Sequence, residues 1–237
     1  MVSVVIPGYN EAENLIILLP RVHAAMRTLG QEFEILFVNN ASKDNTDEVV
    51  RLFQKTMTQL KLLSEPTPGY GRAVNKGLAA ARGEWLGIMR SDNQEKPEDL
   101  VRMFVELQKS GKALYKAIRL HRMNEGLNRV VVSFVYNMLF KILFGLRSTD
   151  INASPKVFTR ELYEAVRLES LDFFTDAELM IKAEYLKAPI GEIGIEYLPR
   201  LKGRSSVRLK HVFEFLENMV WWRAHLRSKM RELGYAR

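Results

Sequence analysis

The sequence predicts an α/β fold with a mostly parallel central sheet flanked by helices. In the first 120 residues, short apolar runs alternate with longer stretches of helical periodicity. Strands that alternate with helices pair in parallel, and the helices then cover both faces of the sheet. The 237 residues are 47% hydrophobic and contain no low-complexity tract or internal repeat, so the chain can bury one full core.

The individual elements follow from apolar patterns and from residues that begin or end helices. The expected strands are residues 2–6, 33–38, 60–63, 85–89 and 190–197. The expected helices are residues 11–29, 44–58, 73–82, 97–109, 128–144, 175–186 and 208–233. We expect one domain over residues 1–207, followed by a basic amphipathic helix at 208–237 that packs on the domain or extends from it.

Polar loops follow the first, second and fourth expected strands, at residues 7–11, 39–46 and 90–96. The carboxyl ends of parallel strands meet at one edge of a sheet, where ligands of such folds bind. We therefore expect these loops to form one site.

The composition excludes several kinds of chemistry. The chain has no cysteine, so disulfides, thiolate metal sites and cysteine nucleophiles are excluded, and a reducing compartment is expected. The N-terminus begins with an apolar run and lacks the charged and then apolar layout of a signal peptide. We therefore expect a cytoplasmic protein.

The net charge of +7 resides in the C-terminal tail. Residues 200–237 contain ten Lys or Arg and three Glu, which gives +7, so residues 1–199 sum to zero. Such a tail suits an anionic membrane surface, a phosphate-bearing substrate or nucleic acid, while a solvated basic helix is the simplest alternative. Nucleic acid ranks last, because no nucleic-acid-binding module accompanies the tail.

Residues 130–146 are strongly apolar. This run of 17 residues contains Lys141 and is bounded by Arg129 and Arg147, whereas a membrane span takes about 20 apolar residues. A buried core helix is our first interpretation, a helix in the membrane interface the second, and a span the third. The tryptophan pair at 221–222, beside basic residues, fits an interfacial helix and core packing equally well.

Four polar segments could bind a ligand, at residues 7–11, 39–46, 69–72 and 89–94. Taken singly, each is explained by turn and helix-capping chemistry. A Gly-x-Gly before a helix also suits an anion, and a carboxylate near an amide at 92–94 suits a divalent cation or a sugar. The order and spacing of the four segments together favour a functional site.

Together these segments resemble the family 2 glycosyltransferases with a GT-A fold, in particular the dolichyl- and polyprenyl-phosphate sugar synthases. The resemblance covers residues 1–207 and rests on several motifs in the family's order. The matching residues are Pro7, Tyr9, Asn10 and Glu11; Ser42, Asp44 and Thr46; Gly69, Gly71, Ala73, Gly77, Ala81 and Gly83; Asp92, Gln94 and Pro97; Arg129 and Ser133; Asp150, Asn152 and Lys156; Asp176 and Glu178; Arg200, Gly203 and Ser205.

The resemblance implies an inverting transfer of a sugar from a nucleoside diphosphate donor to a polyprenyl or dolichyl phosphate. The residues it implies for the donor are Pro7, Tyr9, Asn10, Glu11, Asn39, Asn40, Gly69, Gly71, Arg72, Arg90, Ser91 and Asp92. Those for the acceptor are Arg119, Arg129, Ser133, Arg200 and Ser205. The implied catalytic residues are Asp92, Asp176, Arg129 and Arg200, and the candidate metal ligands are Asp92 and Gln94.

Three residues depart from the family pattern. Arg90 replaces the first acid of the family's D-x-D segment, and Asn39 and Asn40 replace both acids after the second strand, which together adds +4 charge. The guanidinium of Arg90 could supply part of the charge that a divalent cation normally brings. We therefore expect dependence on Mg²⁺ or Mn²⁺ to be weakened or absent. A decayed active site is the competing interpretation.

Two alternative functions stay open at this point. The acceptor could be a soluble small molecule or a glycan hydroxyl, whose proton a carboxylate such as Asp176 would have to take. The chain could also be a non-catalytic subunit that binds a nucleotide sugar. A lipid acceptor implies peripheral attachment at the inner face of the membrane, and self-association into a homo-oligomer is left open.

Overall fold

The computed structural model describes residues 1–120, 127–146, 148–199 and 209–235, with side chains except at 127–134 and 209–212. The strands are β1 (Val2–Gly8), β2 (Phe33–Asn40), β3 (Leu60–Glu65), β4 (Trp85–Ile88), β5 (Leu114–Leu120), β6 (Lys156–Thr159) and β7 (Ile190–Glu196). The helices are α1 (Ala12–Arg27), α2 (Thr46–Gln54), α3 (Tyr70–Ala80), α4 (Pro97–Ser110), α5 (Leu127–Phe144), α6 (Arg160–Val166), α7 (Thr175–Tyr185) and α8 (Leu209–Glu232).

The described strands form one seven-stranded sheet in the order β3-β2-β1-β4-β6-β5-β7. Every neighbouring pair is parallel except those made by β6, which runs antiparallel to both β4 and β5. The α/β fold with a mostly parallel sheet is therefore confirmed.

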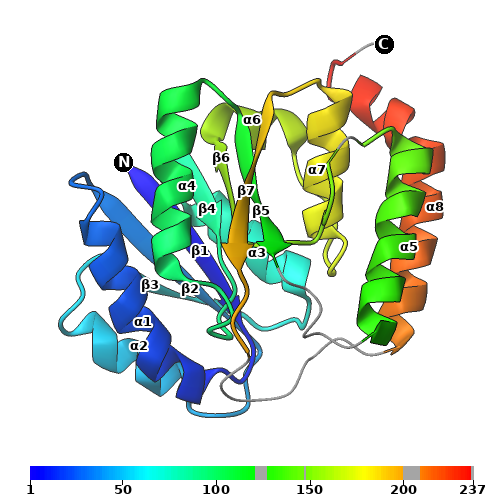
Figure 1. Ribbon diagram of the computed structural model, residues 1–237. Helices are drawn as coiled ribbons and strands as arrows, with labels where there is room; N and C mark the ends of the chain where they lie inside the picture. Colours follow the sequence, from blue (N-terminus) through cyan, green and yellow to red (C-terminus); the bar gives the residue numbers. More distant parts are fainter. Residues whose placement is uncertain (121–126, 147, 200–208, 236–237) are drawn as a thin grey trace.

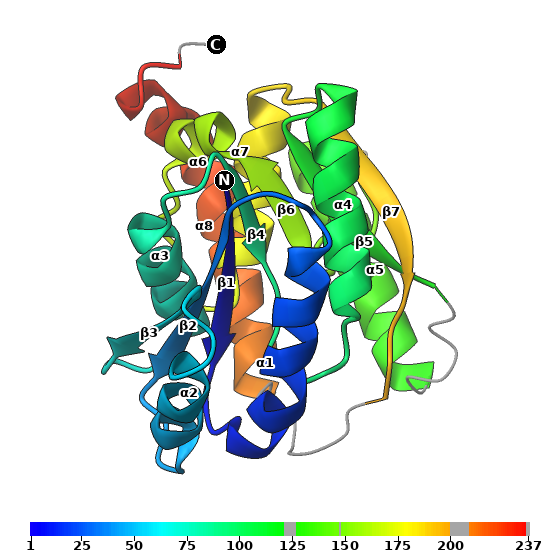
Figure 2. The same cartoon turned by 90° about the vertical axis from the view of Figure 1, so that its left-hand side faces the viewer.

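Helices cover both faces of the sheet, and side chains that alternate along β1 reach two separate cores. Val4 and Ile6 lie in the core under α1, α2 and α4, whereas Val5 lies in the core under α3 and α7. Figure 2 shows α1 and α2 in front of the sheet and α8 behind it. This burial on both faces explains why the central strands are continuous apolar runs.

The sequence does not predict β5, β6 and α6. Lys116 interrupts the apolar run of β5, and Lys156 begins the four-residue strand β6, yet both side chains are fully buried. Helix α6 spans seven residues, from Arg160 to Val166, which is too short to show a helical period. It is capped by Thr159, whose hydroxyl accepts from the Leu162 N–H at 3.1 Å.

Two helices have an end that differs from the expected range by three or more residues. Helix α2 begins at Thr46 and ends at Gln54, inside the expected range of 44–58. Helix α3 begins at Tyr70, so Gly71 and Arg72 lie in its first turn and not in a loop before it.

Helices α5 and α8 lie side by side at one end of the molecule (Figure 1). The buried Phe174, just before α7, packs against Phe215 of α8 with 4.8 Å between ring centroids, and Asn218 donates to Asp172 at 2.7 Å. Within the described part of the chain, no helix has both the length and the apolar character that crossing a bilayer demands. The domain boundary at 207 stays a prediction.

Gly77 of α3 lies where the helix crosses β1 and β2. A Cβ at this position would lie 2.3 Å from Val5 Cγ1 and 3.0 Å from Val38 Cγ2. We expect Gly77→Ala to lower the free energy of unfolding by about 1–3 kcal/mol, because overpacking outweighs the gain in helix propensity. Urea unfolding measures this, with the exposed Ala79→Ser as the matched control; equal stability of the two variants would contradict the close packing of α3.

Candidate active site

The loops after β1 and β2 are tied together at the carboxyl edge of the sheet. Asn10 has a left-handed backbone (φ 55°), its Oδ1 accepts from the Lys43 N–H at 2.7 Å, and its own N–H donates to Ser42 Oγ at 2.9 Å. The Glu11 N–H donates to Thr46 Oγ1 at 3.0 Å. The predicted donor residues of these two loops are therefore held in one fixed arrangement.

Asn39 uses both ends of its carboxamide. Its Nδ2 donates to Asp47 Oδ1 at 2.6 Å, and its Oδ1 accepts from the Ser42 N–H at 3.0 Å. An aspartate at 39 would instead place a second carboxylate against Asp47. Position 39 thus carries an amide where the family has an acid, and the carboxylate at this place comes from Asp47 of α2.

Asn40 is also matched to its surroundings. Its Nδ2 donates to the Thr67 carbonyl at 2.8 Å, and its Oδ1 accepts from the Gly69 N–H at 2.8 Å. A carboxylate could accept from Gly69 but could not donate to the carbonyl. Asn40 therefore joins the end of β2 to the segment that leads into α3.

The first turn of α3 packs directly against the segment before α7. A Cβ on Gly71 would lie 2.1 Å from Thr175 Oγ1, so only glycine fits there. The Arg72 N–H, which the expected anion-binding loop would offer to a ligand, donates to the Leu171 carbonyl at 3.1 Å. This turn therefore joins α3 to α7.

The guanidinium of Arg90 is held by groups from three parts of the chain. Nη1 donates to the Tyr197 hydroxyl at 3.2 Å, and Nη2 donates to the Asn152 carbonyl at 3.0 Å. Nε lies 3.9 Å from Glu95 Oε1, and one third of the Arg90 side chain is exposed. Arg90 is thus a fixed, partly accessible cation at the end of β4.

The rest of the β4 loop is closely packed. The Ser91 hydroxyl donates to the Pro7 carbonyl at 3.0 Å, and the buried Asp92 accepts from the Gln94 N–H at 3.2 Å. The Gln94 side chain donates to the Leu198 carbonyl at 3.2 Å, and the Leu198 N–H donates back to the Gln94 carbonyl at 2.9 Å. The loop is therefore paired with the chain beyond β7.

Arg119 of β5 is paired with an acid. Nη2 and Nε of Arg119 donate to the two carboxylate oxygens of Asp150 at 2.7 and 2.9 Å. The guanidinium also lies 5.5 Å from the centroid of the Tyr197 ring. The acceptor-binding role of Arg119 stays a prediction, and in the structure its charge is compensated by Asp150.

Asp176 lies at the start of α7 with both carboxylate oxygens engaged. Oδ1 accepts from the fully buried Lys156 ammonium at 2.8 Å, and Oδ2 accepts from the Tyr70 hydroxyl at 3.2 Å. Burial lowers the pKa of Lys156, and the nearby carboxylate of Asp176 opposes this. Asp176 is thus a buried, paired carboxylate near Arg90.

Glu95 is fully buried beside Arg90, and its Oε2 accepts from the Arg90 backbone N–H at 3.1 Å. Burial raises the pKa of Glu95 to about 7, against the opposing effect of the Arg90 charge. The carboxyl is therefore partly neutral near pH 7.

Four predicted side chains lie outside the described part of the structure. They are the acceptor or catalytic residues Arg129, Ser133, Arg200 and Ser205. Among the described residues, no group of three or more His, Asp or Glu gathers as metal ligands would. The roles of Asp92 and Gln94 as metal ligands stay predictions, as do the donor-binding roles of the loop residues, including Tyr9, which is 45% exposed.

The sequence does not predict Tyr70, Glu95 and Tyr197 as members of this cluster. Tyr197 lies 107 residues from Arg90 in the chain, and no local pattern marks it. Glu95 lies within the segment that resembles the family through Asp92, Gln94 and Pro97, but it is not itself one of the matching residues. Chain topology brings Tyr70 and Tyr197 to the cluster, whereas Glu95 lies in the same loop as Arg90.

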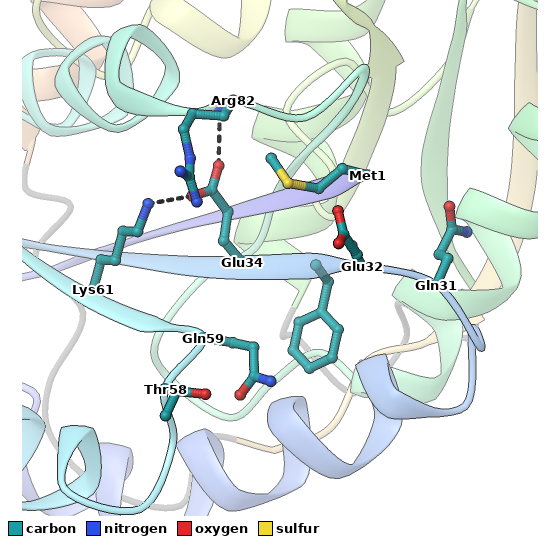
Figure 3. Close-up of a pocket in the computed structure, with 9 residues that line it drawn as sticks. Met1, Gln31, Glu32, Glu34, Thr58, Gln59, Lys61 and Arg82 are labelled. Carbon is teal, nitrogen blue, oxygen red and sulfur yellow. Dashed lines mark hydrogen bonds and ion pairs between the residues drawn. The ribbon is translucent and has the colours of Figure 1, made fainter.

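A cavity of about 580 Å³ lies elsewhere, beside the first residues of β2 and β3 (Figure 3). Its one buried acid, Glu34, is paired with Lys61 at 2.6 Å and with Arg82 at 3.3 Å. The cavity lies at the amino ends of β2 and β3, whereas the loops described above follow the carboxyl ends of the strands. The cavity is therefore separate from the candidate site.

The pairing of Asn39 with Asp47 yields a test by exchange. We expect Asn39→Asp to cost about 1–3 kcal/mol of unfolding free energy, because two carboxylates would meet. The double variant Asn39→Asp with Asp47→Asn restores a carboxylate–amide pair and should recover most of the loss. Urea unfolding of all four proteins measures the coupling; additive effects would show that the two side chains do not interact.

The buried Glu95 yields a test by pH. Burial raises the pKa of Glu95 in the folded state to about 7, above the ordinary value of 4.5. The folded state therefore holds this proton more tightly and loses stability as pH rises from about 4.5 to about 7. Glu95→Gln should abolish a loss on the order of 2 kcal/mol between pH 5 and pH 8. Urea unfolding at both pH values checks this, with the exposed Glu98→Gln as control; the same pH dependence in Glu95→Gln and wild type would refute it.

Comparison with known proteins gives one family and several relatives. The family model described as glycosyl transferase family 2 matches residues 3–167. Undecaprenyl-phosphate 4-deoxy-4-formamido-L-arabinose transferase of Yersinia enterocolitica is 29% identical over 70% of this chain and 50% of its own length. Dolichyl-phosphate beta-glucosyltransferase ALG5C of Trichomonas vaginalis is 28% identical over 94% of this chain and 72% of its own. Dolichol-phosphate mannosyltransferase of Pyrococcus furiosus is 28% identical over 92% of this chain and 62% of its own.

Two of these three relatives are therefore matched over less than two thirds of their length. Among solved structures, glucosyl-3-phosphoglycerate synthase of Mycobacterium tuberculosis, in complex with Mn²⁺, UDP and phosphoglyceric acid, is similar with a TM-score of 0.73. The identity is 17%, over 97% of this chain and 78% of that one, which confirms the GT-A fold and nothing finer. The family model covers well over half of the chain, and the protein belongs to glycosyl transferase family 2.

Proposed function

We propose that the chain is an inverting glycosyltransferase that moves a sugar from a nucleoside diphosphate donor to a polyprenyl or dolichyl phosphate. The observation that carries the proposal is the carboxyl edge of the sheet, where the loops after β1, β2 and β4 are tied together beside the partly exposed Arg90. The names of three relatives describe transfer to undecaprenyl or dolichyl phosphate, which supports the same acceptor class here.

In this reaction the bond between the anomeric carbon and the β-phosphate oxygen breaks, while an acceptor oxygen bonds to the opposite face of the carbon. The departing diphosphate gains negative charge, which a fixed cation stabilises. We assign this role to Arg90. A structural neighbour binds Mn²⁺ together with UDP. Here Asp92 and Gln94 offer a divalent cation one carboxylate and one amide next to a guanidinium, which is a poor donor set for such an ion.

The state of Asp176 supports a phosphate acceptor. A hydroxyl acceptor needs a base to take its proton, whereas a lipid phosphate is already an anion. Both oxygens of Asp176 are engaged, by Lys156 and by Tyr70, so this carboxylate is not set up as a free base. The geometry thus favours an acceptor that arrives deprotonated.

The helices α5 and α8 support a lipid environment. Val135, Met138 and Ile142 of α5 and Phe213 and Val220 of α8 are exposed at 44–70%. Basic residues of the tail near an anionic surface would each add about 1 kcal/mol to binding. We propose that these helices attach the protein to the inner face of the membrane and present the lipid phosphate to the site.

The transfer assay mixes the protein with radiolabelled UDP-glucose or GDP-mannose and vesicles that contain undecaprenyl or dolichyl phosphate. We expect label in the organic phase, and a loss of about 100-fold or more for Asp92→Ala, with the exposed Arg51→Ala as control. Arg129→Ala and Arg200→Ala should abolish transfer yet keep donor binding. Transfer only to soluble hydroxyls would overturn the lipid acceptor, and nucleotide-sugar binding without turnover would identify a non-catalytic subunit.

The role of Arg90 predicts how transfer responds to metal. In excess EDTA the wild type should keep most of its activity. Arg90→Asp restores the family's acid and should lose about 100-fold in EDTA, with partial recovery on addition of Mn²⁺. The exposed Arg51→Asp, with the same charge change on α2, should behave as the wild type. Strict dependence of the wild type on Mg²⁺ or Mn²⁺ would end this assignment.

A further inference from the structure

Arg90 and Arg119 both contact Tyr197, but only Arg119 has its charge neutralised by a close carboxylate. Arg119 lies 5.5 Å from the centroid of the Tyr197 ring and is neutralised by two hydrogen bonds to the Asp150 carboxylate. Arg90 binds the hydroxyl of the same tyrosine and the Asn152 carbonyl. Arg119 is thus a compensated cation. The Arg90 guanidinium donates hydrogen bonds to two uncharged oxygens, and the carboxylate of Glu95 lies farther away, 3.9 Å from Nε.

The protonation of Tyr197 matters for the charge of Arg90. Burial raises the pKa of Tyr197, so the phenol stays neutral at physiological pH. A neutral phenol fixes the direction of the guanidinium without cancelling its charge. Of the five guanidinium N–H groups, Tyr197 and Asn152 occupy one each, and one third of the Arg90 side chain is accessible.

The ring of Tyr197 is itself fixed from the side of Arg119. The paired Asp150 also accepts from the Arg119 backbone N–H at 3.2 Å, and Asp150 has a left-handed backbone (φ 53°). The Asn152 carbonyl that holds Arg90 follows two residues later. Arg119 therefore contacts one holder of Arg90 directly and fixes the segment that carries the other.

We propose that Tyr197, stacked on Arg119, is a positioning residue that aims the Arg90 guanidinium at the β-phosphate of the donor. This inference rests on the proposed function and extends it to two residues outside the family motif at 90–97. It reassigns Arg119 from the acceptor phosphate to the support of the donor site. An arginine with a correctly fixed guanidinium binds a phosphate with little loss of side-chain entropy.

The test compares ligands with and without a β-phosphate. Calorimetry in EDTA measures binding of UDP and UMP, or of GDP and GMP if the protein prefers guanine. Tyr197→Phe removes the hydroxyl and keeps the ring. We expect the diphosphate to bind about 3- to 10-fold more weakly and the monophosphate to bind as in the wild type. Arg119→Lys, which keeps the charge but loses the bidentate pair, should show the same pattern.

Two controls separate positioning from a structural role. Tyr163→Phe is matched, since the Arg160 guanidinium lies 5.9 Å from the Tyr163 ring, and it should change neither affinity. In an Arg90→Met background, Tyr197→Phe should have no further effect on diphosphate binding.

Three results would overturn the inference: an unchanged diphosphate affinity in Tyr197→Phe, an equal loss for both ligands, or an effect that persists in Arg90→Met. Each of these can arise while the wild type still prefers the diphosphate, which leaves the proposed function in place. A wild type that binds neither UDP nor GDP would instead refute the proposed function.

Discussion

The charge of Arg90 at the end of β4 is the constraint on which the candidate site depends. To bind an anion, a partly buried guanidinium must be fixed in orientation by groups that do not neutralise its positive charge. Here a phenol and a backbone carbonyl hold it, while the carboxyl group of Glu95 lies 3.9 Å from Nε and has a pKa raised by burial. The surrounding side chains are arranged so that their own charges cancel in pairs, as in the pair of Lys156 with Asp176.

This pairing bears on whether the site has decayed. A decayed site would keep the substituted residues without adjusting their neighbours. Instead, Asn39 meets an acid on α2, and Asn40 meets both a carbonyl and an N–H. Both asparagines that replace a family acid therefore have partners that suit an amide. Buried polar groups without such partners destabilise a fold, so these contacts support a site that is maintained in an altered form.

The fold and the loops could be predicted because their signals are local. Apolar runs on β1 and β2 and the turn residues after them mark strands and strand ends. The strand β5 could not be predicted, since Lys116 interrupts its apolar run, and β6 has only four residues and begins with Lys156. Both buried lysines are paired with acids from other elements, Glu192 and Asp176. Tyr197 could not be predicted either, because its contact with Arg90 arises from the order of strands in the sheet.

The central claim is that Arg90 receives the donor diphosphate, which in a structural neighbour is bound together with Mn²⁺. A crystal structure with UDP or GDP, grown with Mn²⁺ present, tests it most directly. The account predicts β-phosphate oxygens within hydrogen-bonding distance of the Arg90 guanidinium, which still contacts Tyr197 and Asn152. A Mn²⁺ ion bound by Asp92 and Gln94 between protein and diphosphate, with Arg90 turned away, would contradict it.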